Sequence, residues 1–179
     1  MEYIENKIIE TENLIMRPLE SSDAEAIFNN ISHDKEALKY YIAPYIEDLK
    51  DASIDGMIEG CKLHKRYAFA IVIKENNEVI GMLNQCNKPD YVFRNLEIGM
   101  AIGQQYWNKG YGSEALKAAI EFFFSVGIHK VYAQHIIDNI ASKRIMEKAG
   151  MIFEGIRKDE LYYHDKYHDV GCYYMLNDK

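Results

Sequence analysis

The sequence predicts a mixed α/β fold, in which a mostly antiparallel central sheet is flanked by helices. Apolar runs joined by short turns indicate hairpins, whose strands are antiparallel. Two segments with helical periodicity are separated by a strand, and such crossovers join parallel strands. The length of 179 residues and the 48% hydrophobic content fit a single domain over residues 1–179.

The first third of the chain predicts one strand followed by helices. NLIMRPL (13–19) is typical of a short strand. Ser22 or Asp23 can cap the helix that follows it, because their side-chain oxygens accept hydrogen bonds from first-turn amides. Residues 34–65 are expected to be mostly helical, with an interruption at Pro44.

A hairpin and a further strand occupy the middle of the chain. YAFAIVI (67–73) and VIGMLNQ (79–85) are strand-like runs separated by a turn that contains Asn76 and Asn77. NLEIGMAI (95–102) is predicted to be the next strand.

Two helices with a strand between them follow. Apolar residues recur at helical spacing over 112–126, and Gly127 stands where a helix stop is expected. KVYAQHII (130–137) is the intervening strand. Asn139 can cap the second helix, which Gly150 ends.

The last segment, residues 151–176, is β-rich, with HDK (164–166) at the tip of a hairpin. His164 and His168 are four residues apart, a spacing that suits a metal pair on a helix. On a hairpin those positions are far apart. We therefore expect no metal site.

Composition excludes several classes of function. The formal net charge of −7 gives no basic field for nucleic acid, although it would attract a cationic substrate. No apolar run approaches the ~20 residues of a membrane span. The acidic opening MEYIENKIIE is unlike a secretory signal, so a cytoplasmic location is expected. Cys61, Cys86 and Cys172 show neither a disulfide framework nor zinc spacing.

The stretch WNKGYGSEA (107–115) places two glycines where a helix should begin. Amides at a helix N-terminus attract anions, and glycines let them approach closely. A dinucleotide fingerprint is disfavoured, because GQQYWNK (103–109) separates the glycines from the strand and Lys130 stands where an acidic residue is required. A Walker A motif is absent. The alternative to an anion-binding role is that the two glycines only form a turn.

With its neighbours, this stretch resembles the GNAT superfamily of acetyl-coenzyme A-dependent N-acetyltransferases, whose pyrophosphate loop reads Gln/Arg-x-x-Gly-x-Gly/Ala. EIGMAIGQQYWNKGYGSEAL is similar to the ribosomal-protein N-acetyltransferase branch, where Trp often replaces Gln/Arg, as Trp107 does here. HKVYAQHIIDNIASKRIMEKAGMIFEG, ENLIMRPLESSDAEAIF and YHDVGCYYML resemble further blocks of the family, so the resemblance covers residues 10–177.

The resemblance implies that two central strands splay apart around acetyl-CoA. The first of them, ending at Met100, Ala101 and Ile102, would pair with the pantetheine. The pyrophosphate would be held by amides of the glycine loop, namely Asn108, Lys109, Gly110, Tyr111, Gly112 and Ser113. Asn139 would contact the pantetheine arm, be a plain helix cap, or do both.

The implied reaction is direct attack of a neutral amine on the thioester in a ternary complex. Glu97 is a candidate base, although a strand carboxylate can also be merely exposed, and Glu160 is a comparable candidate. In many members of the family a tyrosine acts as the general acid, and Met146, which occupies its position here, cannot donate a proton. The branch suggests Ser142 as the acid, unless it is an ordinary first-turn serine or the thiolate leaves unaided.

The predicted function is acetyl transfer to a primary amine, either a protein N-terminus or a small molecule such as an amino sugar, polyamine or antibiotic. A non-catalytic coenzyme A-binding module and a nucleotide-binding regulatory domain are the alternatives. The chain is expected to be a monomer or a homodimer, the latter through a sheet edge or the face that carries Phe122–Phe124.

Overall fold

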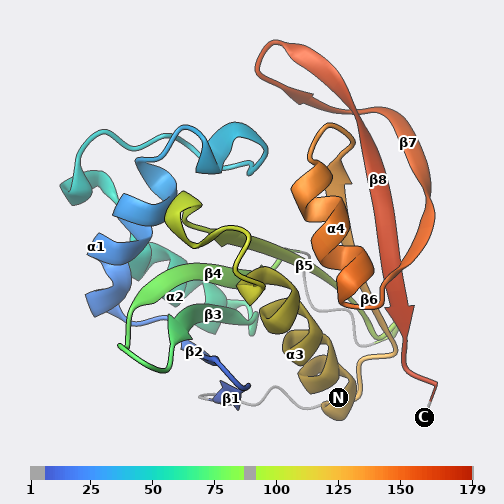
Figure 1. Cartoon of the computed structure of the whole chain (residues 1–179), viewed down its shortest axis with the longest axis horizontal. Coiled ribbons are helices and arrows are strands. Elements are labelled where there is room, and N and C mark those ends of the chain that lie inside the picture. The colour runs from blue at the N-terminus through green and yellow to red at the C-terminus, as the bar shows by residue number, and fades with distance from the viewer. Residues whose placement is uncertain (1–6, 87–91, 179) are drawn as a thin grey trace.

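The computed structural model describes residues 7–86 and 92–178, and its centre is one eight-stranded sheet (Figure 1). The strand order is β1-β2-β3-β4-β5-β6-β8-β7. The strands are β1 (Ile9–Glu10), β2 (Leu14–Pro18), β3 (Ala68–Ile73), β4 (Val79–Gln85), β5 (Asn95–Ile102), β6 (Lys130–Ile136), β7 (Ile152–Tyr163) and β8 (Lys166–Leu176). Neighbours pair antiparallel except β5 and β6, which are parallel, so the predicted mixed sheet is confirmed.

The two predicted helices of the second half are confirmed. The α-helices are α1 (Ala24–Ile27), α2 (Ile54–Leu63), α3 (Tyr111–Ser125) and α4 (Ile140–Lys148). Gly127 and Gly150 follow α3 and α4 with φ of +92° and +89°. This left-handed conformation carries no steric penalty for glycine, which is why these residues end the helices.

The prediction that residues 34–65 are mostly helical is wrong. Only α2 is α-helical there, and two single 3-10 turns, η3 (Ala37–Lys39) and η4 (Leu49–Asp51), precede it. Asp34 Oδ1 accepts the backbone N–H of Glu36, and Asp48 Oδ1 accepts that of Lys50. Such local bonds satisfy the backbone in turns, and Pro44 lacks the N–H that a continuous helix needs.

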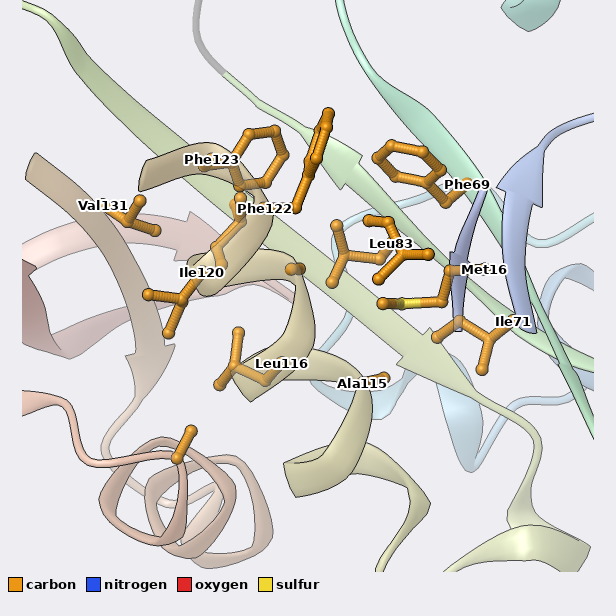
Figure 2. Close-up of a cluster of buried hydrophobic side chains, with 14 of the residues drawn as sticks. Met16, Phe69, Ile71, Leu83, Ala115, Leu116, Ile120, Phe122, Phe123 and Val131 are labelled. Carbon is orange, nitrogen blue, oxygen red and sulfur yellow. The ribbon is translucent and has the colours of Figure 1, made fainter. Parts of the chain in front are cut away.

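Helices cover the two faces of the sheet unequally. On one face, α3 buries an apolar stripe against β2 to β6, and Phe122 and Phe123 pack there near Phe69 (Figure 2). Both rings also contact the ring of Tyr67. On the other face, α1 and α2 cover a smaller cluster over β2 to β5. Phe122 and Phe123 are buried within the chain, whereas Phe124 is partly buried.

The middle of the sheet splits open. β5 and β6 pair only at Asn95–Lys130, Leu96–Val131 and Glu97–Tyr132. Beyond that point β5 stays with β4 and β6 stays with β8, so the strands diverge and the predicted splay is confirmed. Because parallel strands end at one edge, α3 and α4 both begin at the open end of this gap (Figure 1).

Candidate functional site

The loop before α3 is held in a defined shape. Trp107 Nε1 donates to the carbonyl of Ile102, the last residue of β5, over 2.6 Å. Asn108 and Gly110 have φ of +61° and +90°, and Ser113 Oγ donates to the Gly110 carbonyl over 2.9 Å. The first amides of α3 have no carbonyl within the helix to bond to, so this fastened loop presents donors at the open end of the gap.

The two glycines of the loop are required for different reasons. A Cβ on Gly110 would meet nothing within 4 Å, so this position needs glycine for its left-handed backbone. A Cβ on Gly112 would lie 2.8 Å from Ile145 Cδ1 and 3.4 Å from Met100 Cε. Gly112 therefore lets α3 approach α4 closely beside the end of β5. Lys109 is exposed, with Nζ 5.5 Å from the centre of the Tyr106 ring.

The start of α4 forms the other side of the open end. Asn139 Oδ1 accepts the backbone N–H of Ser142 over 3.0 Å, so the predicted cap is confirmed. The cap uses the side-chain oxygen and leaves the amide nitrogen as a donor. Ser142 is half-buried in the first turn. Met146 is only 2% exposed within the core, so the position of the family's tyrosine carries no proton donor here.

The end of β5 offers a free edge toward the gap. Met100, Ala101 and Leu83 lie in the paired stretch of β4 and β5, while the opposite edge of β5 has diverged from β6. Side chains alternate across the sheet, so Met100 and Ile102 pack on the α3 face and Ala101 packs on the α1 face. An extended chain can pair with such an edge through main-chain hydrogen bonds.

A cavity of about 590 Å³ lies on the face opposite α3, where β5, β6, β7 and β8 meet. Its lining residues are Asn95, Glu97, Lys130, Tyr132, Gln134, Glu154, Gly155, Ile156, Arg157 and Cys172. Lys130 Nζ and Glu154 Oε1 form an ion pair across 2.7 Å. The cavity is therefore polar, with carboxylates on β5 and β7 and cations on β6 and β7.

Glu97 stands in this cavity at the last residue pair before the strands diverge. Gln134 Nε2 donates to its carboxylate over 3.0 Å. Burial raises the pKa of Glu97, against the opposing effects of the Arg157 charge and of hydrogen bonds from Tyr132 and Gln134. Glu97 is thus half-buried in the cavity rather than an exposed strand carboxylate.

Glu160, the second candidate base, is placed differently. It lies on β7 and pairs with Arg157, with 3.1 Å between Oε1 and Nη1. Both side chains of this pair are exposed, and Glu160 does not line the cavity. The structure therefore brings Glu97, and not Glu160, to the point where the strands part.

Several cavity residues were missed by sequence reasoning. Tyr132 and Gln134 are the outward members of the alternation in β6, a signal that was available in the sequence. Cys172 is buried in the cavity lining, and burial raises its pKa. Cys86 is exposed, and a Cβ on Gly99 would lie 2.8 Å from its sulfur. These two cysteines are near the site because strand pairing brings distant segments together.

The β7–β8 hairpin reaches back toward the irregular N-terminal segment. Tyr163 Oη donates to the carbonyl of Leu38 over 3.0 Å and contacts that of Tyr41 at 3.3 Å. Tyr41 Oη donates to Asn84 Oδ1 over 3.3 Å. The segment around Leu38–Tyr41 therefore links the hairpin tip to β4 on the side of the sheet that carries Glu97.

Within residues 7–86 and 92–178, no group of three His, Cys, Asp or Glu side chains could hold a metal ion. None of the helices in these ranges combines the length and the apolar character that a membrane span needs. The predicted hairpin around His164 is present, and His168 Nε2 lies 3.0 Å from the Tyr163 carbonyl.

Comparison with known proteins agrees with this architecture. Residues 13–152 match the family described as Acetyltransferase (GNAT) domain. The uncharacterized N-acetyltransferase YoaA of Bacillus subtilis is 29% identical over 96% of this chain and 98% of its own. An Escherichia coli [ribosomal protein uS5]-alanine N-acetyltransferase is 27% identical, over 84% of this chain and 81% of its own. A Vibrio cholerae spermidine N(1)-acetyltransferase is 24% identical, over 93% and 94%.

Solved structures share the whole fold. An acetyltransferase (GNAT family) from Bacillus anthracis superimposes with a TM-score of 0.83 at 27% identity, over 97% of this chain and 100% of its own. RimL, a ribosomal L7/L12 alpha-N-protein acetyltransferase in complex with coenzyme A, gives a TM-score of 0.85 at 22% identity, over 96% and 99%. The second likeness supports the fold alone.

Proposed function

Because the chain belongs to the GNAT acetyltransferases, which use acetyl-CoA, we propose that it transfers an acetyl group to a primary amine bound in the Glu97 cavity. The observation that carries this proposal is the gap between β5 and β6. The N-termini of α3 and α4 lie at the open end of this gap, and the polar cavity reaches the gap at Glu97 and Gln134. A donor and an acceptor can therefore meet at the gap from opposite sides, as direct attack in a ternary complex requires.

The residues around the gap fit acetyl-CoA, which supplies the acetyl group as a thioester when bound. The free edge at Met100, Ala101 and Ile102 suits pairing with the pantetheine amides. The amide nitrogen of Asn139 is available to the same arm. The anionic pyrophosphate would accept hydrogen bonds from the loop that comprises Asn108, Lys109, Gly110, Tyr111, Gly112 and Ser113.

In this proposal Glu97 is the general base. An alkylamine with a pKa near ~10.4 is mostly protonated at neutral pH and must lose a proton before its nitrogen can attack. The carboxylate of Glu97 takes that proton, directly or through a water, and the neutral nitrogen then forms the N–C bond. As the C–S bond breaks, the nitrogen loses a second proton, which balances the one that the released thiolate takes up. Its raised pKa brings it closer to the operating pH, which favours this role.

Proton return to the leaving thiolate is assigned to Ser142. Its hydroxyl is in the first turn of α4, at the open end of the gap. Met146 is buried and cannot substitute for it. A thiol is also acidic enough to leave as the anion, so we expect Ser142→Ala to reduce the rate less than a change at Glu97 does.

The acceptor is proposed to be a protein N-terminal amine or a small amine. Two of the relatives are named for a ribosomal protein and for spermidine, so these two classes define the first test. Purified protein is incubated with acetyl-CoA and a panel that contains N-terminal peptides, spermidine, an amino sugar and an aminoglycoside, and free thiol is measured. Release of coenzyme A that depends on one acceptor supports the proposal. Binding of coenzyme A without turnover across the panel would instead identify a non-catalytic module.

A further inference from the structure

Four charged side chains line the acceptor cavity, and two of them form an ion pair with each other. Lys130 and Glu154 neutralise one another across 2.7 Å, and Lys130 also lies 4.9 Å from the centre of the Tyr174 ring. The other two charged residues of the lining are Glu97 on β5 and Arg157 on β7. A bound molecule therefore meets one carboxylate and one guanidinium, on strands that form opposite sides of the cavity.

Arg157 is suited to bind a ligand anion. Its protein partner in the described chain is Glu160, through Nη1 at 3.1 Å, and both side chains are exposed at 49% and 45%. Exposed pairs of this kind contribute little free energy and exchange readily. A guanidinium has five N–H donors, and its planar fork fits a carboxylate through two parallel bonds. Most of its donors are therefore available to a ligand.

Arg157 lines the same cavity as Glu97, Tyr132 and Cys172. Its positive charge acts to lower the pKa of each of these three groups. An anion held by Arg157 would therefore lie near an amine that Glu97 deprotonates. A polyamine would instead place its second cation near the guanidinium, which is unfavourable.

We propose that Arg157 recognises a carboxylate on the acceptor, so that the preferred substrate carries an acidic group a few bonds from its primary amine. This inference rests on the proposed acetyl transfer at the Glu97 cavity. Two sources share the required chemistry, a free amino acid and a peptide N-terminus followed by an acidic residue. Spermidine and other polyamines lack the carboxylate and are expected to be poor acceptors.

The test compares matched acceptors that differ only in that charge. The first pair consists of two peptides that differ only in having Asp or Asn as the second residue. The second pair consists of a free amino acid and the same amino acid with its carboxylate converted to an amide. For each, kcat/KM is measured with the wild type, Arg157→Gln and Arg157→Lys. For each protein, the kcat/KM of the carboxylate acceptor is divided by the kcat/KM of its amide. In the second pair, amidation also changes the pKa of the amine, but this change is the same for every protein. Comparing the ratio of the variant with the ratio of the wild type therefore removes it.

A charge-assisted hydrogen bond to the acceptor predicts that the carboxylate-to-amide ratio of kcat/KM is about 10- to 100-fold lower in Arg157→Gln than in the wild type. Arg157→Lys keeps the charge without the fork and should retain part of the preference. The control is Lys158→Gln, which removes a neighbouring exposed cation of β7 that pairs with Asp169 outside the cavity lining, and should leave the ratio unchanged. The free amino acid and the acidic peptide separate the two sources.

Failure of this inference is distinguishable from failure of the proposed function. Equal use of acid and amide acceptors, with the ratio unaffected by Arg157→Gln, would overturn the inference while acetyl transfer stands. If no acceptor is acetylated, the proposed function fails. Binding then decides the inference: carboxylate-bearing amines should raise the melting temperature of the wild type and not of Arg157→Gln, and no difference would overturn it. Arg157→Gln must also keep the melting temperature shift with coenzyme A, which confirms that it is folded.

Discussion

Glu97 is the residue on which the catalytic proposal depends. We expect Glu97→Gln to lower kcat/KM by about 10²- to 10⁴-fold, the usual contribution of a general base. The change keeps the shape of the side chain and its bond to Gln134, so the melting temperature shift with coenzyme A should stay the same. Glu160→Gln is the comparison variant, because Glu160 lies outside the cavity lining, and it is measured with an acceptor that has no carboxylate because Glu160 pairs with Arg157. A larger loss in that variant would reverse the two assignments.

The pH dependence of kcat/KM should also show that Glu97 is the general base. Only the deprotonated carboxylate accepts a proton, so kcat/KM is lost as the pH falls through the pKa of Glu97. Burial raises that pKa, which places the acid limb above the usual range of a glutamate. The charge of Arg157 opposes this rise, so Arg157→Gln should move the limb to still higher pH. An acid limb that survives in Glu97→Gln would belong to another group.

At the scale of elements, the contact between α3 and α4 separates two roles of the glycine loop. Gly112→Ala would place a Cβ 2.8 Å from Ile145 Cδ1. Because Cδ1 is the free end of the Ile145 side chain and can move aside, we expect a loss at the low end of the ~1–3 kcal/mol of unfolding free energy that overpacking typically costs. Ile145→Val removes that very methyl group, so the double variant Gly112→Ala/Ile145→Val should recover most of the loss. Stability is measured by chemical denaturation.

Binding of coenzyme A to the same variants then tests whether Gly112 also contributes to pyrophosphate binding. If Gly112 also lets the amides of α3 approach a pyrophosphate, the double variant should be stable and still bind coenzyme A more weakly than Ile145→Val alone. If affinity returns with stability, Gly112 serves only the packing of the two helices. Isothermal titration of all four proteins decides between these outcomes.

Elements were predictable where local chemistry agrees with the global fold. The hairpins, α3, α4, the Asn139 cap and the two glycine stops follow from periodicity and backbone preference alone. Residues 34–65 were not predictable in this way, because Asp34 and Asp48 satisfy the backbone locally and no continuous apolar stripe selects a helix.

The site was predictable only where its residues are contiguous in the sequence. The glycine loop is contiguous in sequence, and its motif identified it. The cavity is assembled from four strands, and the pairing of β8 between β6 and β7 decides which side chains face Glu97. Arg157 and Cys172 carry no local signal of this placement.

At the scale of the whole molecule, the sheet consists of two paired blocks with a short seam between them. β1 to β5 form one block and β6, β8 and β7 the other. Three parallel residue pairs, the core under α3, the contact of α3 with α4 and the hydrogen bonds of Tyr163 join the two blocks. Acetyl-CoA bound in the gap would touch both blocks. A ligand that binds only the folded state stabilises it by about 2.7 kcal/mol at 100 times its Kd.

We therefore expect coenzyme A to raise the melting temperature, whereas ATP and NAD should not. Hydrogen exchange locates the effect, because amides lose protection only when their bonds open or their edge is exposed. With coenzyme A, exchange should slow in the 98–102 segment of β5 and in residues 110–113, while β1, at the far edge of the sheet, keeps its rate. Slowing confined to the β7–β8 hairpin, or an equal response to ATP, would place the ligand elsewhere and return the glycine loop to a simple turn.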